Sequence, residues 1–480
     1  MNSQRVHSKK KTRRFLQLTF QDYYHNNADR VTIPDRIGHR EFGMENWEYT
    51  WHCPKRHITD DNKDKKIVGC GKSGRSFTKI EKCPYCGSTA INVNNWDRHK
   101  GFRSPSALLN ELSTNAPHSV YHSAAFYDVP VARHMNEKGW QGAELIFDID
   151  ADHLESQCTE DHDAWRCNNP DCRKTGTGNP PEDGCPECEG RSFSTRKWIC
   201  ENCLEDAKRN TLKIYDEFLV DDFGINPGSI QMNYSGHRGY HIRVKDPHVF
   251  ELDSNARIEI VHYITGLGFK TATATTTSPG RHSLTVVSRE YPLPTSELRQ
   301  YDVPGWGNRL SKAMIDFIRN LESYDGTERW VTPLKKRRAE AIEGLLRTPP
   351  VLSPKVKGIG DKFWSEIAMK AVDYYGGETD IPVTHDIHRV IRLIGSLNGK
   401  TGFRVCSLER DEMDSFDPFS DALAFHTGSL TVRFIGGSVD VPEFRIGDIT
   451  YGPYNGEVVD LPMPAAVFSL CKGVATIESK

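Results

Sequence analysis

The stretch ELIFDID, residues 144–150, is the part of the chain that best indicates its fold and chemistry. In an extended strand successive side chains alternate between faces, so Asp148 and Asp150 project from one face and Leu145, Phe147 and Ile149 from the other. Two carboxylates this close repel each other in an apolar setting, and a hard divalent cation such as Mg²⁺ relieves that repulsion. The pattern predicts a metal-binding strand. The alternative is a strand end whose acids face water or cap the next helix.

The 480-residue chain has the composition of a globular protein, with 37% hydrophobic and 26% charged residues. Its length suggests two or three domains. It contains no run of eighteen apolar residues, and its basic N-terminus lacks the apolar segment of a secretory signal, so we expect a cytoplasmic protein without a membrane partner. Because the formal net charge is −3, nucleic-acid binding would have to use local basic patches.

Thirteen cysteines occur in short groups, and metal ligation in a reducing compartment accounts for this grouping better than disulfides do. The first group contains Cys-Pro-Tyr-Cys at 83–86, a zinc-knuckle sequence whose turn presents two thiolates to one metal. It predicts an inserted zinc ribbon over residues 47–90, with His57 or His52 as an alternative to the second cysteine. The predicted ligands are Cys53, Cys70, Cys83 and Cys86.

The second group follows the ELIFDID strand and contains two nested sets of ligands, within a predicted domain over residues 153–206. Four protein ligands leave no open coordination position for chemistry, so these sites should be structural. Three zinc ions are therefore expected in the whole chain. The outer set, a zinc knuckle, is Cys158, His162, Cys200 and Cys203, and the nested ribbon is Cys167, Cys172, Cys185 and Cys188.

Hydrophobic periodicity predicts the elements after residue 300. The region 310–376 should be a helical subdomain, the segment TDIPVT at 379–384 is typical of a strand, and HDIHRVIRLIG at 385–395 has its apolar residues at helical spacing.

The sequence Ser235-Gly-His-Arg-Gly-Tyr-His241 should form the turn between two strands. Its glycines permit a close approach of the backbone to a ligand, and Ser235 and main-chain amides can donate hydrogen bonds. Arg238 and His241 could neutralise a phosphate. The pattern predicts a phosphate-binding turn, and a plain glycine hairpin with exposed basic residues is the alternative.

Taken together, these motifs resemble the small catalytic subunit of the archaeal and eukaryotic DNA primases. FDIDADH is followed by a Cys/His knuckle, SGHRGYHIRV, DIPVTHDIHRVIRLIGSLNGKTG and FDPF, in that order, and CLEDAK and RGYHIRV are similar to archaeal members. The resemblance runs from HREF at 39–42 to FDPF at 416–419. It implies an α/β (α+β) catalytic core over residues 15–465, made of two sheets with flanking helices, the helical subdomain and inserted zinc ribbons.

The same resemblance assigns roles to individual residues. The catalytic acids would be Asp148, Asp150 and Asp380, holding two Mg²⁺ or Mn²⁺ ions, whereas Asp386, the rival third acid, is better explained as a helix cap. Asn398 stands where the family usually has histidine, and Lys400 could compensate for the missing charge. The implied nucleotide contacts are Arg98, Ser235, Gly236, His237, Arg238, His241, Arg392, Asn398 and Lys400.

The implied activity is DNA-dependent primer synthesis from nucleoside triphosphates on a single-stranded DNA template, extending an RNA/DNA primer in a heterodimer with a primase large subunit. The alternatives are a stand-alone primase-polymerase or end-joining polymerase of the same superfamily, and a non-catalytic zinc-ribbon protein that binds nucleic acid. The cysteine clusters at 53–86 and 167–188 exceed the family's single knuckle. We expect them to stabilise long insertions, and contact with template or partner is the alternative.

Overall fold

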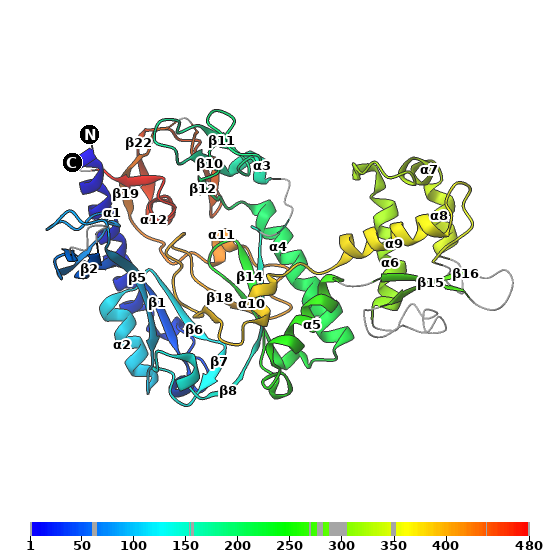
Figure 1. Cartoon of the computed structure of the whole chain (residues 1–480), viewed down its shortest axis with the longest axis horizontal. Coiled ribbons are helices and arrows are strands. Elements are labelled where there is room, and N and C mark those ends of the chain that lie inside the picture. The colour runs from blue at the N-terminus through cyan, green and yellow to red at the C-terminus, as the bar shows by residue number, and fades with distance from the viewer. Residues whose placement is uncertain are drawn as a thin grey trace. The chain divides into compact units, whose positions relative to one another are not determined.

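The chain is a mixed α/β protein that forms two compact units (Figure 1), as a computed structural model shows. This confirms the predicted fold class. The first unit comprises Met1–Lys208, Gln231–Leu252 and Asp386–Lys480, and the second comprises Arg209–Ile230 and Asp253–His385. The residues that the structure describes are 2–59, 65–152, 154, 158–267, 270–275, 282–287, 305–346, 352–437 and 439–478.

Two sheets form the framework of the first unit. The larger has the strand order β17-β6-β1-β4, with β5 also paired to β1, and the smaller has the order β18-β13-β14-β9. The larger sheet consists of β1 (Phe42–His52), β4 (Ser73–Ser76), β5 (Asn92–Lys100), β6 (Ser119–Ser123) and β17 (Val390–Arg392). The smaller consists of β9 (Leu145–Asp150), β13 (Ile230–Tyr234), β14 (Gly239–Val244) and β18 (Cys406–Leu408).

Helices and short sheets complete the first unit. Helix α2 (Pro105–Asn115) begins after Ser104, whose hydroxyl accepts a hydrogen bond from the N–H of Ala107 at 3.3 Å. The helices are α1 (Asn2–Asn26), α2 (Pro105–Asn115), α3 (Thr159–His162), α4 (Glu201–Lys213), α11 (Pro418–Asp421) and α12 (Met463–Cys471). The remaining strands outside the cysteine clusters are β7 (Ala125–Tyr127), β8 (Trp140–Ala143), β19 (Ser429–Phe434), β20 (Phe444–Ile446), β21 (Ile449–Tyr451), β22 (Val458–Pro462) and β23 (Ala475–Ile477).

The second unit is mainly helical. Apolar faces of α6 and α9 bury Trp306, Leu310, Trp364 and Ile367. Its elements are the π-helical Ile214–Asp222, α5 (Ser254–Thr265), β15 (Lys270–Thr275), β16 (His282–Val287), α6 (Trp306–Arg319), α7 (Val331–Lys336), α8 (Arg338–Leu345), α9 (Asp361–Tyr375) and α10 (Ile381–His385). None of the helices in the described part of the chain combines the length and the apolar character that a membrane crossing requires.

The segment 379–395 differs from its prediction. The expected strand at 379–384 includes helix α10, and the expected helix at 385–395 contains strand β17, which pairs with β6. The β-branched Val390 and Ile391 suit a strand, and hydrogen bonding to β6 outweighs the helical spacing of the apolar residues. Asp386 consequently caps a turn rather than a helix, since its carboxylate accepts the N–H of His388 at 2.9 Å.

Buried ion pairs connect the two sheets of the first unit. Arg40, directly before β1, contacts Glu144 at 2.5 Å, and Glu144 also contacts Arg243 on β14 at 2.7 Å. Glu41 contacts Lys138 at 3.2 Å and Arg98 at 2.8 Å. Removing one partner of such a pair leaves an uncompensated buried charge and costs about 3–5 kcal/mol. The HREF motif therefore stabilises the frame on which β9 and β14 lie.

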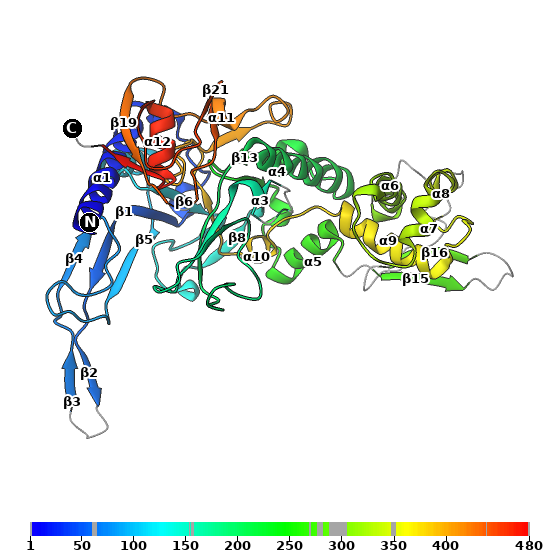
Figure 2. The same cartoon turned by 90° about the horizontal axis from the view of Figure 1, so that it is seen from above.

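Two of the cysteine clusters are copies of one three-stranded unit. We call residues 49–94 the outer ribbon (Figure 2) and residues 164–196 the inner ribbon (Figure 1). In the outer ribbon Trp51 pairs with Gly74 and Val93, and in the inner ribbon the equivalent tryptophan pairs with a glycine and a threonine at the same register. The inner ribbon is built from β10 (Ala164–Cys167), β11 (Thr175–Thr177) and β12 (Phe193–Arg196).

The repeat is detectable only from residue 70 onward. Residues 70–94 match residues 172–196 without a gap, but the outer ribbon has an additional hairpin, β2 (Arg56–Thr59) and β3 (Lys65–Val68), between its first two cysteines. A Cβ atom at Gly74 or Gly176 would lie within 2.7 Å of the paired tryptophan ring, so both copies need glycine there.

Candidate active site

Strand β9 places Asp148 and Asp150 side by side on one face, as the alternation of ELIFDID predicts. Both are partly exposed, whereas Ile149 between them is buried. Burial and the neighbouring carboxylates of Asp152 and Asp148 raise the pKa of Asp150. A carboxylate pair whose charged form is disfavoured in this way is stabilised by a divalent cation, so the donor set fits Mg²⁺ or Mn²⁺.

His241 on β14 lies directly opposite Asp148, with its Nε2 3.4 Å from Asp148 Oδ1. Burial and the positive charge of Arg392 lower the pKa of His241 to about 3, so the ring is neutral. Asn233 lies 3.1 Å from the other ring nitrogen, Nδ1, and can donate to it, which leaves Nε2 to carry the proton toward Asp148. The imidazole therefore positions the carboxylate and does not provide the positive charge that the sequence suggested.

The SGHRG turn between β13 and β14 is held from one side by the SLNGKT segment. Gly236 has a φ of 76°, and a Cβ atom there would lie 2.8 Å from that of Asn398. The Asn398 amide donates to the carbonyl of Ser235 at 3.1 Å, and the hydroxyl of Thr401 donates to the carbonyl of Gly236 at 2.5 Å. Asn398 thus uses its side chain to hold the turn, and any contact with a nucleotide stays a prediction.

Two arginines present buried donor groups near this turn. Arg238 pairs with Asp152 at 2.5 Å and with Asp163 at 3.4 Å, but its Nε and Nη2 have no hydrogen-bond partner among the described residues. The same holds for Nη1 of Arg392, whose guanidinium lies 4.8 Å from the ring centroid of Tyr121. Each unsatisfied buried donor costs about 1–3 kcal/mol. An anion with several acceptor oxygens would remove this cost.

Additional cations surround His237. Burial and the charges of Lys472 and Lys400 hold the pKa of His237 well below its usual value. Sequence analysis missed Lys472, which follows α12, because a single lysine after an apolar segment carries no distinctive pattern. Burial and the charge of Arg238 lower the pKa of Lys472 to about 7. A bound phosphate would favour its protonated form.

Asp163 connects the knuckle to the SGHRG turn and was also missed. It is 1% exposed, and its Oδ1 lies 2.9 Å from Nδ1 of His162 and accepts the N–H of Trp198 at 2.8 Å. Its Oδ2 lies 3.2 Å from Lys197 Nζ and 3.4 Å from Arg238 Nη1. A carboxylate that fixes the orientation of a metal-ligating histidine is a common outer partner of zinc sites. Here the same carboxylate also orients Arg238.

The structure brings together the members of each of the three predicted ligand sets, with all ligand atoms of a set within 4.8 Å of one another. In the outer ribbon the sulfur atoms of Cys53 and Cys86, and of Cys70 and Cys83, are 3.6 Å apart. A tetrahedral zinc with Zn–S bonds of about 2.3 Å implies sulfur separations of about 3.8 Å. All thirteen cysteines are free thiols, and each of the three sets could hold zinc.

The alternative ligands of the outer ribbon are not needed. Cys70 occupies the fourth position of that set. His52 instead faces the hydroxyl of Ser73, with its Nδ1 2.8 Å from Oγ. The side chain of His57 lies outside the described residues.

Two further predicted residues, Asp380 and Arg98, lie outside β9 and the SGHRG turn. Asp380 belongs to the second unit, directly before α10, and its carbonyl accepts the N–H of Val383 at 3.0 Å. Arg98 lies on β5 of the larger sheet, and its Nε donates to the buried carboxylate of Glu41. Its Nη2 has no partner within the described part of the chain, so it also retains a donor for an anion. The catalytic role of Asp380 and the nucleotide contact of Arg98 stay predictions.

Comparison with known proteins identifies the family. The DNA primase small subunit family matches residues 183–408. A DNA primase small subunit of Methanothrix thermoacetophila is 34% identical over 399 residues, covering 79% of this chain and 89% of that protein. The chain belongs to the DNA primase small subunit family. A DNA primase small subunit of Methanococcoides burtonii is 29% identical, covering 97% of this chain and 98% of its own, and one of Cenarchaeum symbiosum is 27% identical, covering 96% and 97%.

Proposed function

We propose that this member of the DNA primase small subunit family is the catalytic subunit of a DNA primase, which joins nucleoside triphosphates on a single-stranded DNA template. The observation that carries the proposal is the pairing of β9 with β14, which places Asp148 opposite His241 and Asp150 opposite Gly239, the last residue of the SGHRG turn. Acidic side chains for metal ions thereby lie beside the turn in which Arg238 keeps free guanidinium donors for phosphate.

Each part of the site has a task in nucleotidyl transfer. By the family resemblance, Asp148, Asp150 and Asp380 would hold Mg²⁺ or Mn²⁺. When bound, two such ions supply Lewis-acid chemistry to the attacking 3′-hydroxyl and the departing pyrophosphate. The SGHRG turn with Arg238, Arg392 and the nearby lysines would bind the triphosphate through charge-assisted hydrogen bonds.

The remaining residues act through these groups. His241 keeps Asp148 in place by a neutral hydrogen bond, and Asn398 keeps the turn in its left-handed conformation. The three cysteine sets would hold structural zinc, about three ions per chain. By the family resemblance, a primase large subunit would complete a heterodimer.

A synthesis assay tests the proposal. The chain is incubated with and without a large subunit from the same organism, on a single-stranded template with labelled ribonucleotides or deoxyribonucleotides and Mg²⁺ or Mn²⁺. We expect primer synthesis, lost by about a thousandfold or more in Asp148→Asn and Asp150→Asn, which preserve size but remove the metal-binding charge. Asp161→Asn, an exposed acid on α3, is the matched control. No synthesis by the unmodified chain in every combination would overturn the proposal, as would full activity of Asp148→Asn.

A further inference from the structure

The two ribbons have opposite charge although their backbones match. Between its first and last cysteines, the outer ribbon has nine Lys or Arg against four Asp or Glu, and the inner ribbon has two against four. A zinc ion with four thiolates contributes the same charge of −2 to both, so the difference of seven charges remains. A local positive charge in a chain of formal net charge −3 marks a region suited to a polyanion.

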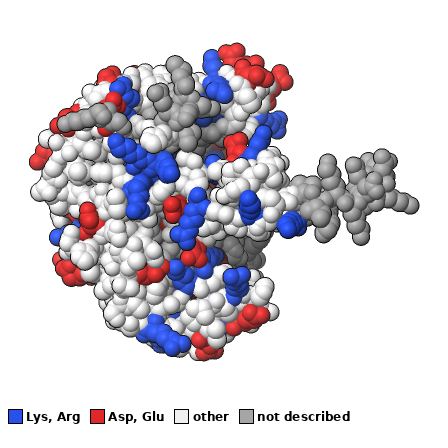
Figure 3. Space-filling model, turned by 90° about the vertical axis from the view of Figure 1, so that its left-hand side faces the viewer, with Lys and Arg blue, Asp and Glu red and all other residues white. Residues whose placement is uncertain are grey.

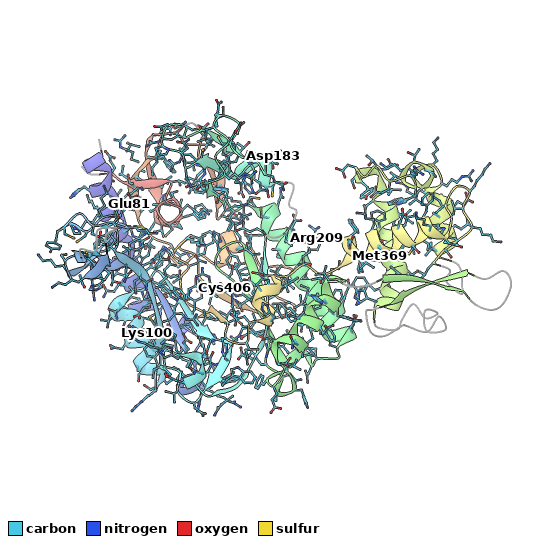
Figure 4. All side chains as sticks on the ribbon, in the orientation of Figure 1. Glu81, Lys100, Asp183, Arg209, Met369 and Cys406 are labelled. Carbon is cyan, nitrogen blue, oxygen red and sulfur yellow. The ribbon has the colours of Figure 1, made fainter. Side chains whose placement is uncertain are left out.

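The described part of the outer ribbon carries this charge at its surface. Lys55, Lys72, Arg75, Lys79 and Lys82 are all exposed. Figure 3 shows Lys and Arg side chains spread over the side of the molecule on which this ribbon lies. The exposed Glu81 matches Asp183 of the inner ribbon (Figure 4), so the divergence comes from the cations and not from loss of an acid.

An aromatic side chain distinguishes the two Cys-Pro-x-Cys turns. Tyr85 in the outer ribbon is 62% exposed, lies 6.0 Å from the ring of Trp51 and has Nζ of Lys72 3.9 Å from its ring centroid. At the matching positions of the inner ribbon, Lys174 instead pairs with Glu187 at 3.0 Å. An exposed ring beside a lysine can stack on a base while the ammonium contacts the adjacent phosphate.

The faces of the two ribbons also differ in what surrounds them. The outer ribbon has a hollow of about 470 Å³, and its wall consists of its own strands, with Trp51, Arg75, Asn92 and Asn94 among the lining residues. The corresponding hollow of the inner ribbon is lined by Trp165, Thr175 and Ser194 at the matching positions. Part of its wall is supplied by other segments of the same chain, namely Ile435, Gly436, Gly437, Val439, Val441, Gly473 and Val474. The inner ribbon thus shares the lining of its hollow with neighbouring segments of the chain, whereas the hollow of the outer ribbon is lined by its own strands.

From these differences we propose that the outer ribbon is a binding site for single-stranded DNA, with Tyr85 as the stacking platform, the hollow beside Trp51 as a neighbouring base site, and the five exposed cations as phosphate contacts. That the bound strand is the template rests on the proposed function. The binding itself does not, since it needs neither nucleotide nor catalysis. The inner ribbon lacks the ring and the positive charge and shares its hollow with neighbouring segments, so it has no such role.

Equilibrium binding of a fluorescent oligothymidylate to the full chain, without nucleotide or divalent metal, tests the proposal by anisotropy. Because stacking on one aromatic residue contributes about 1–3 kcal/mol, Tyr85→Ala should weaken binding by about tenfold or more, and Tyr85→Phe should bind like the unmodified chain. Glu187→Ala at the matching position of the inner ribbon is the control and should change nothing.

Two further measurements distinguish a loss of base stacking from a loss of the metal site and from a general loss of DNA binding. Zinc analysis should show the same metal content in all variants, because none of them changes a ligand. A duplex of the same length should lose little affinity in Tyr85→Ala, since its bases cannot stack on the ring. Unchanged oligothymidylate binding in Tyr85→Ala would overturn the proposal, and so would an equal loss in Glu187→Ala. Primer synthesis by the unmodified chain would still support the proposed function in either case.

Discussion

The outer and inner ribbons have the same three-stranded backbone arrangement, and they differ in the side chains that this arrangement does not require. Both retain four cysteines, a tryptophan packed on a glycine, and a lysine two residues after the second cysteine, because these residues hold the metal site and the small core. Tyr85 in one copy and Glu187 in the other occupy the same turn. A metal-stabilised scaffold tolerates such exchanges, since its folding free energy comes from the metal ligands and not from the exposed side chains.

The inner ribbon differs further in its contacts with other segments of the first unit. Arg196 at its end donates to the carbonyl of Asp440 at 2.6 Å, and the knuckle in which it is nested reaches Arg238 through Asp163. The outer ribbon has only its own small core of Trp51 and two cysteines, with flanking apolar residues. Loss of the zinc knuckle should therefore affect primer synthesis, and loss of the outer ribbon should affect the binding of single-stranded DNA.

Removal of a metal ligand should give the largest difference in primer synthesis between the knuckle and the outer ribbon. Cys200→Ser in the knuckle should lower primer synthesis about a hundredfold, because His162, Asp163 and Arg238 lose their common anchor. Cys86→Ser in the outer ribbon should leave synthesis at saturating template nearly unchanged and raise the template concentration that gives half-maximal rate. Elemental analysis should show a loss of about one zinc in each variant. Equal loss of synthesis in both would contradict the separation of roles.

Asp163→Asn should have the next largest effect. The amide keeps the size of the side chain but removes the charge that pairs with Arg238, so the KM for nucleoside triphosphate should rise about tenfold while kcat changes little. Steady-state kinetics at varied nucleotide concentration measure kcat and KM separately. Asp161→Asn, exposed and two residues away, should behave like the unmodified chain. A fall in kcat with constant KM would show that Asp163 does not act through triphosphate binding.

Local patterns predicted strand β9 and the three cysteine clusters well, because each depends on residues close in sequence or on fixed ligand chemistry. The alternation in ELIFDID placed Asp148 and Asp150 on one face, and cysteine spacing gave all three ligand sets. The strand β17 was predicted as a helix because pairing with β6 is a long-range contact that periodicity does not report.

Residues that act through a neighbour were not predictable. Asp163 is one acid among many in the sequence, and only its contacts with His162 and Arg238 give it a role. The neutral form of the His241 ring was not predictable for a related reason, since burial between strands lowers its pKa. The ribbon repeat was missed because the hairpin β2–β3 changes the spacing of the first two cysteines.

Exchange of Tyr85 and Glu187 between the two Cys-Pro-x-Cys turns compares the two ribbons directly. Tyr85→Glu should weaken oligothymidylate binding by about tenfold or more, because the new carboxylate both removes the ring and can pair with Lys72, as Glu187 does with Lys174. The reverse change, Glu187→Tyr, should leave the affinity within about twofold, since the inner ribbon stays acidic and its hollow partly walled. Anisotropy measures both. A strong gain of affinity in Glu187→Tyr would show that the aromatic ring alone decides binding.

Removal of two exposed cations should give the smallest change in oligothymidylate affinity. This change should depend on the salt concentration. Lys79 and Lys82 match Pro181 and Gly184 of the inner ribbon, so Lys79→Ala/Lys82→Ala makes the outer copy resemble the inner one in charge without touching Tyr85. Each lost phosphate contact lowers the slope of log affinity against log salt by about 0.7 for a single strand. Titrations with oligothymidylate at several salt concentrations should therefore show a shallower slope in the double variant, with affinities that converge at high salt. An unchanged slope would mean that these lysines lie outside the path of the strand and that stacking on Tyr85 provides most of the affinity.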